Sequence, residues 1–181
     1  YVEGVEAFIS RVLGPSLTSL ERLAGGLEGD SNQELALLVL ARLAPVSSEG
    51  QARWQRLAGD GLKHASLSVK RASAQLLVSL APLEEPEKAL RLAQEVRRDD
   101  DSVSDIALRA ELARLWGRHM SIERAPQIRE FLMDESPTVR AAMIDGLKGH
   151  NISSIQSILR TMLNDPVASI RSSVASLLAD R

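Results

Sequence analysis

The chain has 181 residues, enough for one large domain or two small ones, and 44% of them are hydrophobic, as in an ordinary globular protein. Its 22 basic and 24 acidic residues nearly cancel, so the overall charge does not point to nucleic acid or an anionic membrane. The absence of Cys excludes disulfides, thiolate metal sites and Cys nucleophiles, and an aromatic content of 3% argues against a β-sandwich or barrel.

Apolar residues recur at helical spacing, and no segment alternates with period two, so we expect an all-α fold. A leading helix is expected over residues 3–13. After it we expect pairs of helices, named A and B in each pair: A 16–27 with B 31–43, A 48–63 with B 66–80, A 86–98 with B 103–117, A 122–133 with B 137–148, and A 152–164 with B 167–180. No apolar run is long enough to span a membrane, and the lack of an initiator Met leads us to expect an excerpt of a longer chain.

Two segments near the end of the chain repeat almost position for position at an offset of 31 residues. Asp134 aligns with Asp165, and Arg140 aligns with Arg171. An apolar anchor opens each B helix, and the anchors are Leu35, Val69, Leu108, Val139 and Ile170, at spacings of 34, 39, 31 and 31. Units of this length predict helix pairs that bury their apolar stripes only by stacking on their neighbours.

The pattern Asp-x-x-x-x-Val/Ile-Arg, followed by a helix that closes on Leu, resembles the HEAT repeat, close to the armadillo class. The resemblance implies an α-solenoid of about five stacked helix pairs plus an N-terminal helix. His64 replaces the turn Asp of the second unit and Ala36 replaces the Arg of the first, so the first half departs from the pattern. We expect one repeat domain over residues 1–181, with units at approximately 15–45, 46–82, 83–120, 121–150 and 151–181.

Lys70, Arg109, Arg140 and Arg171 occupy the same position in four consecutive units. One interpretation is a basic ladder that binds phosphates or an acidic peptide. The other, which we favour, is that each Arg bonds a turn Asp of its own or the next unit and so fixes the register between units. We expect Asp165 and Arg171 to meet in this way.

The outward face of the B helices is the candidate partner-binding surface. Positions two, five, six and nine after each anchor are expected to point away from the core. From these positions we select Leu37, Leu40, Arg71, Gln75, Val78, Arg114, Ile144, Asp145 and Lys148. Leu40, Val78 and Ile144 are the expected apolar anchors of a groove for a partner helix or extended peptide. In an equally open interpretation, Ala and Ser on this face merely favour helix, and the N-terminal helix covers Leu37 and Leu40.

Trp54 and Trp116 are interpreted as packing residues. A role in stacking on bases would need an exposed ring beside a cation. Arg53, Arg56 and Lys63 do flank Trp54, and they provide the best local case for nucleic acid.

No motif indicates catalysis or a cofactor. The sequence has no Gly-x-Ser-x-Gly elbow, no Gly-rich phosphate loop and no His-Glu-x-x-His. His64, His119 and His150 are expected near helix ends rather than at a metal, because equivalent atoms in neighbouring units are too far apart to share one ion. We therefore expect no enzymatic activity, no cofactor and no metal site.

These observations favour a non-enzymatic scaffold or adaptor that binds another protein, as a helix or peptide, on the B-helix face that the resemblance makes concave. The alternative is a nucleic-acid-binding HEAT-like module of a repair or chromatin assembly, although nucleic acid is not the expected partner. A third, lower-ranked alternative is an accessory enzyme such as the bilin lyases that carry similar repeats. Without Cys or a membrane span, we expect a cytoplasmic protein, or a nuclear one in a eukaryote.

Overall fold

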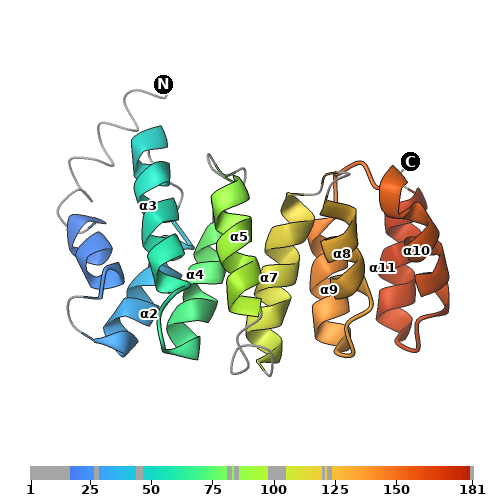
Figure 1. Cartoon of the computed structure of the whole chain (residues 1–181), viewed down its shortest axis with the longest axis horizontal. Coiled ribbons are helices and arrows are strands. Elements are labelled where there is room, and N and C mark those ends of the chain that lie inside the picture. Colours follow the sequence, from blue (N-terminus) through green and yellow to red (C-terminus); the bar gives the residue numbers. More distant parts are fainter. Residues whose placement is uncertain are drawn as a thin grey trace. The chain divides into compact units, whose positions relative to one another are not determined.

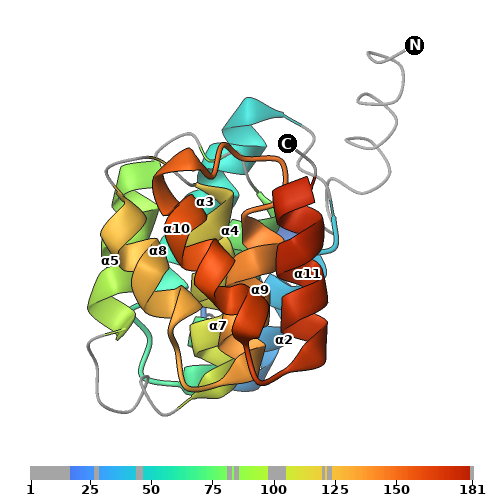
Figure 2. The same cartoon turned by 90° about the vertical axis from the view of Figure 1, so that its right-hand side faces the viewer.

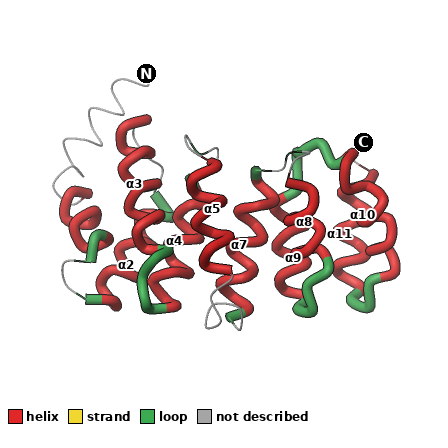
Figure 3. The backbone as a smooth tube through the Cα atoms, in the orientation of Figure 1, coloured by secondary structure: helices red, strands yellow, loops and turns green. Residues whose placement is uncertain are grey.

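The structure, a computed structural model, describes residues 17–26, 29–43, 47–80, 83, 86–97, 105–119, 121 and 124–179. The chain divides into two compact units, residues 1–96 and 97–181, and each unit is described by itself. Every regular element in the described ranges is a helix (Figure 3). This confirms the expected all-α class, whereas the single domain over residues 1–181 stays a prediction. None of the described helices is long and apolar enough to cross a membrane.

The described part of the N-terminal unit begins with helical residues 17–24, drawn in blue in Figure 1. It continues with α2 (Asp30–Leu40), α3 (Ser48–Gly61), α4 (Leu67–Ser79) and α5 (Pro86–Arg97). Ser47 caps α3, because its side chain accepts a hydrogen bond from the N–H of Gly50 at 3.1 Å. These helices lie close to the predicted ranges, and the leading helix expected over 3–13 lies outside the described residues.

The C-terminal unit contains α7 (Ile106–Arg118), α8 (Ala125–Leu132), α9 (Pro137–Gly146), η2 (Ser153–Ile155), α10 (Gln156–Thr161), η3 (Met162–Asn164) and α11 (Ala168–Ala179). The helix predicted over 152–164 is thus a short α-helix between two turns of 3-10 helix. Asn151 Oδ1 accepts bonds from the N–H and the hydroxyl of Ser153, which tightens the opening turn.

In the N-terminal unit, α4 packs against α2 and α3. Here the predicted register of α2 is wrong: the expected anchor Leu35 is 62% exposed, while Leu37 and Leu40 are fully buried. Gln33 shares the buried stripe, and its Nε2 donates to the carbonyl oxygen of Ala24 at 3.0 Å. The buried stripe of α2 is therefore Gln33, Ala36, Leu37 and Leu40, rotated around the helix from the predicted one.

In the C-terminal unit, α9 contacts α7, α8 and α11 (Figures 1 and 2). Two glycines allow α7 and α9 to touch backbone to backbone. A Cβ on Gly117 would lie 2.8 Å from the carbonyl carbon of Gly146, and a Cβ on Gly146 would lie 2.5 Å from the carbonyl oxygen of Arg114. Any side chain at either position would force the helices apart.

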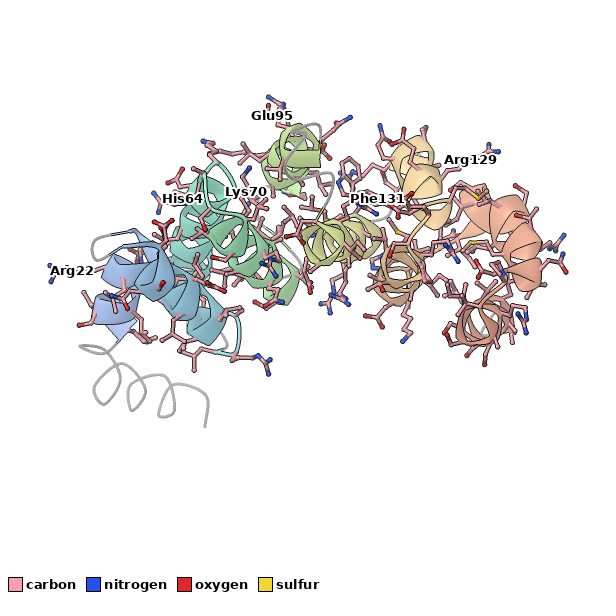
Figure 4. All side chains as sticks on the ribbon, turned by 90° about the horizontal axis from the view of Figure 1, so that it is seen from below. Arg22, His64, Lys70, Glu95, Arg129 and Phe131 are labelled. Atoms are coloured by element: carbon pink, nitrogen blue, oxygen red, sulfur yellow. The ribbon has the colours of Figure 1, made fainter. Side chains whose placement is uncertain are left out.

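The core of the C-terminal unit lies between α8 and the B helices. Phe131 on α8 points inward and is 1% exposed, whereas Arg129 on the same helix points to solvent (Figure 4). Val139 and Met143, predicted on the buried stripe of α9, are fully buried. Pro137 stands at the start of α9, where its missing N–H costs no helical hydrogen bond.

Candidate functional site

The turn between α10 and α11 is tied to the preceding repeat by a two-pronged ion pair. Arg140 Nε donates to Asp165 Oδ2 at 2.8 Å, and Arg140 Nη2 donates to Asp165 Oδ1 at 3.0 Å. The third nitrogen, Nη1, donates to the carbonyl oxygens of Asp134 and Glu135 in its own turn, at 2.8 and 3.0 Å. One guanidinium therefore joins two consecutive turns with a fixed geometry.

The same contact recurs one repeat earlier. Arg109 Nη2 donates to Asp134 Oδ1 at 3.1 Å. Each Asp also accepts the backbone N–H two residues on, from Ser136 at 2.8 Å and from Val167 at 2.9 Å. The favoured interpretation is thus confirmed for both Arg residues: each binds the turn Asp of the next repeat.

Asp165 does not meet Arg171 in the way the sequence predicts. Arg171 Nη1 donates to the carbonyl oxygens of Asp165 and Pro166, while the carboxylate is taken by Arg140. Burial of Asp165 opposes its ionisation, but the hydrogen bonds from Arg140 and from the Val167 N–H outweigh it and hold the pKa of the carboxyl below its ordinary value.

The basic ladder is therefore not available to a ligand at its central rungs. Lys70, Arg109 and Arg140 are 7%, 7% and 8% exposed, and the two Arg residues are bound by carboxylates. Arg171 is exposed, at the start of α11. The phosphate-binding interpretation of this ladder loses its support at Arg109 and Arg140.

In the N-terminal unit, His64 takes over one role of the turn Asp, which is to accept a backbone N–H at the start of the B helix. Its Nδ1 accepts a hydrogen bond from the N–H of Ser66 at 3.0 Å, two residues on, as the carboxylates of Asp134 and Asp165 do in their turns. Its Nε2 lies 3.8 Å from Asp30 Oδ1. The capping contact is kept although the residue type differs.

The four apolar members of the predicted partner-binding surface are in the core, so their predicted exposure is wrong. Leu37 and Leu40 are 0% exposed, Ile144 is 1% exposed and Val78 is 7% exposed. The reason is clearest for Ile144: α9 is covered on three sides, by α7, α8 and α11, so only a narrow strip of it meets solvent. A helical wheel that assumes one buried stripe places such a residue outside.

The polar members of the predicted surface are not all together. Three of them meet in the C-terminal unit: Arg114 of α7, Asp145 of α9 and Lys148, which follows α9. Arg114 Nε lies 3.3 Å from Asp145 Oδ2, and Lys148 Nζ lies 2.8 Å from Asp145 Oδ1. The hydrogen bond from Lys148, together with the charge of Arg114, lowers the pKa of Asp145. Arg71 and Gln75 lie one turn apart on α4 of the N-terminal unit, both half-buried.

Both Trp residues are packing residues, as predicted, with Trp54 2% and Trp116 6% exposed. Trp54 Nε1 donates to Glu21 Oε1 at 2.7 Å. Arg53 lies 3.5 Å from Glu21 and 3.4 Å from Glu49. The ring is therefore closed to a base, and the adjacent residue Arg53 is shared between two carboxylates.

His119 caps the end of α7, as expected for a histidine near a helix end. Burial, with His150 and Arg118 nearby, lowers its pKa below the ordinary value for histidine, so the neutral ring is favoured. Within the ranges that the structure describes, no group of three or more His, Cys, Asp or Glu side chains could hold a metal ion.

Sequence analysis missed a hollow of about 350 Å³ between α3 and α5 in the N-terminal unit. It is lined by Ala52, Gln55, Arg56, Gly59, Asp60, Lys63, Lys88, Ala89 and Leu92. The sequence singles out Arg56 and Lys63 only as neighbours of Trp54. The signal that could have revealed the hollow is Gly59, a glycine in the interior of a predicted helix.

No family model and no curated sequence matches this chain. Among solved structures, it is similar to the archaeal HEAT-like repeats protein from Thermococcus onnurineus NA1, with 13% identity, a TM-score of 0.60, and coverage of 98% of this chain and 74% of that one. The recurrent helix pairs and the Arg–Asp contacts between successive turns agree with this similarity. The chain therefore has the HEAT-like helical-repeat fold that its sequence predicts.

Proposed function

We propose that this chain is a non-enzymatic scaffold that binds a helix or peptide of another protein on the B-helix face of its C-terminal unit. The HEAT-like fold supports an interaction role in general, because stacked helices present an extended surface to a partner. The observation that carries the proposal is the charged strip formed by Glu111, Arg114, Asp145 and Lys148, which we call the α7–α9 strip. Asp145 and Lys148 are exposed, whereas Glu111 and Arg114 are partly covered.

The charges of the α7–α9 strip alternate in sign and are held in place. Arg114 bridges Glu111, with Nη1 2.6 Å from Oε2, and Asp145, with Nε 3.3 Å from Oδ2. Ala141, exposed on α9, adds a small residue beside the strip that leaves room for a partner backbone. Alternating charges of this kind favour one partner register and oppose others.

The nucleic-acid alternative has less support. Arg109 and Arg140, the cations that a phosphate backbone would need in the predicted ladder, are bound by Asp134 and Asp165. Trp54, the only predicted stacking platform with cations beside it, is buried. The charged groups of the α7–α9 strip are two acids and two bases, which does not favour a polyanion.

Site-specific photo-crosslinking in cell extract tests the proposal. Benzoylphenylalanine at Ala141, beside the strip, should give a discrete protein adduct, whereas the same group at Arg129, exposed on α8, should not. The double change Arg114→Glu and Lys148→Glu should abolish the adduct and weaken the purified complex about tenfold or more. Equal adducts from both positions, or an adduct that survives the charge reversal, would contradict the proposal.

A further inference from the structure

The hollow between α3 and α5 lies wholly within the N-terminal unit and is separate from the α7–α9 strip. Small or apolar residues form its floor, namely Ala52, Gly59, Ala89 and Leu92. Figure 1 shows α3 and α5 side by side. Gly59 of α3 lies near Leu92 of α5, since a Cβ built on Gly59 would be 3.4 Å from Leu92 Cδ1. A volume of about 350 Å³ is within the range of natural binding pockets.

Gly59 is not required by the fold. Its backbone is helical, since it lies within α3 and is not among the glycines with positive φ. A Cβ built on it would meet only the tip of Leu92, with Cδ1 at 3.4 Å, whereas Gly117 and Gly146 face backbone atoms at 3.0 Å or less. A helix-interior Gly costs about 1 kcal/mol relative to Ala. Because Gly59 has no side chain, it leaves the hollow beside Leu92 unfilled.

Cations border this floor. Arg56 lies on α3, and Lys63 lies seven residues later, in the turn that follows the helix end at Gly61. Because Leu62 keeps helical backbone angles and the Lys63 N–H donates to the Asp60 carbonyl oxygen, the chain continues the helical path, and the two cations are about 10 Å apart along the helix axis with Gly59 between them. Lys88 faces the hollow from α5. Among the described lining residues the one acid is Asp60, whose Oδ1 lies 3.8 Å from Lys63 Nζ with both side chains largely exposed.

Arg56 offers most of its guanidinium to an incoming group. Within the described part of the chain, its one hydrogen bond is a long contact from Nε to the carbonyl oxygen of Ala52, at 3.4 Å. A carboxylate can therefore take its two terminal nitrogens. The hollow thus combines an apolar floor with a cationic border, which suits a segment that is both acidic and aliphatic.

We propose that this hollow, the α3–α5 groove, binds a helical segment of a partner protein that carries two carboxylates two turns apart and an aliphatic residue midway between them. The carboxylates would meet Arg56 and Lys63, and the aliphatic residue would cover Gly59 and Leu92. Two turns of helix advance about 10 Å, which matches the spacing of the two cations. A protein segment fits better than nucleic acid, because none of the described residues that line the groove has an aromatic ring to stack on a base.

Binding of a designed peptide to the intact chain tests this assignment. The probe is a fluorescent Ala-rich helical peptide with two Glu seven residues apart and one Leu between them; the matched control has the same composition with the two Glu adjacent. Fluorescence anisotropy at low salt should show binding of the probe at least about tenfold tighter than of the control. Equal binding of the two peptides, binding of neither, or tighter binding of a short DNA duplex of equal charge would overturn the proposal.

Charge variants locate the site. Arg56→Glu and Lys63→Glu should each weaken probe binding about tenfold. Asp60→Asn should strengthen probe binding, because the Asp60 carboxylate repels the acidic peptide and pairs with Lys63. Arg22→Glu, an exposed cation outside the groove (Figure 4), should change it by less than about twofold. Equal losses in the Arg22 and Arg56 variants would mean that binding is only diffuse attraction, and would overturn the assignment.

Gly59 separates a binding role from a structural one. Gly59→Ala should raise the melting temperature and yet weaken probe binding, and Gly59→Leu, which fills the groove, should abolish binding. If the fold required a glycine at position 59, Gly59→Ala would instead lower the melting temperature. A lower melting temperature for Gly59→Ala, or unchanged binding in Gly59→Leu with the fold intact by circular dichroism, would overturn the proposal.

Discussion

The turns that precede the B helices are capped by different residue types in the two units. In the C-terminal unit, Asp134 and Asp165 cap their own turns and also bind Arg109 and Arg140 of the preceding repeats. In the N-terminal unit, His64 caps its turn in the same way. However, α2, the preceding B helix, contains no Lys or Arg that could reach across.

This difference separates two tasks that one Asp performs at once. The first is local: a side-chain acceptor satisfies a backbone N–H at the start of the B helix. The second is long-range: a carboxylate fixes the position of the next repeat through a guanidinium. Because α2 contains no Lys or Arg, no guanidinium links it to this turn. Its contacts with its neighbours are instead the buried Leu37 and Leu40 and the approach of Asp30 Oδ1 to His64 Nε2 at 3.8 Å.

The largest effect is expected from breaking the ion pair of the C-terminal unit. Arg140→Ala leaves the buried Asp165 carboxylate without its partner and removes the donor to two carbonyl oxygens. Loss of one member of a buried pair costs about 3 kcal/mol or more. Urea unfolding followed by circular dichroism measures it, and Arg160→Ala, an exposed Arg of the same unit, is the control. A loss below about 1 kcal/mol would show that the pair is not a main contributor to stability.

Glycine substitutions should act with opposite sign in the two units. Gly146→Ala places a Cβ 2.5 Å from the carbonyl oxygen of Arg114, so α7 and α9 must separate, at a cost of about 2 kcal/mol. Gly59→Ala should instead stabilise the protein by about 0.5 to 1 kcal/mol through helix propensity. Thermal melts of both variants measure the difference. Destabilisation of similar size in both would contradict the argument that only Gly146 is fixed by packing.

Acid should weaken the C-terminal unit through Asp165. The folded-state pKa of this carboxyl is lowered, so ionised Asp165 stabilises the fold above the unfolded pKa of about 3.9, and this contribution is lost as pH falls through the folded pKa. Hydrogen exchange read residue by residue should show α11 losing protection below about pH 4. In Asp165→Asn this step should be absent; its persistence would assign the acid sensitivity to another group.

The smallest effect is expected at His64. His64→Ala removes the acceptor for the N–H of Ser66 and should cost about 1 kcal/mol. His64→Asn restores a neutral acceptor two residues before that N–H and should recover most of the loss. Chemical unfolding of the two variants measures this, and equal losses would show that the ring is held for its packing instead of its hydrogen bond.

The repeat pattern predicts much of the fold because it recurs in sequence. Asp134 and Arg140 reappear 31 residues later as Asp165 and Arg171, so helix pairs and an Arg–Asp contact between repeats are both inferable. Which Arg reaches which Asp is not, since it depends on the distance between stacked turns. The structure selects the Asp 25 residues after the Arg.

The candidate sites are less predictable, because each depends on surfaces from more than one helix. A wheel drawn for α9 alone places Ile144 outside, but α7, α8 and α11 leave only a narrow strip exposed. In the same way, the α3–α5 groove combines Arg56 and Gly59 with Leu92 of the following pair. The apolar periodicity of one helix does not show which parts of its surface the neighbouring helices cover.

A double-mutant cycle on Arg140 and Asp165 tests most directly whether a carboxylate of one turn couples to the preceding repeat. The free energy of unfolding would be measured for the wild type, Arg140→Ala, Asp165→Ala and the double variant, with a parallel cycle on Arg171 and Asp165. We predict a coupling of about 1.5 kcal/mol or more for Arg140 with Asp165 and a clearly smaller one for Arg171, whose hydrogen bonds within the described part of the chain are to backbone carbonyl oxygens. Additivity of Arg140 and Asp165 within about 0.5 kcal/mol would contradict the account.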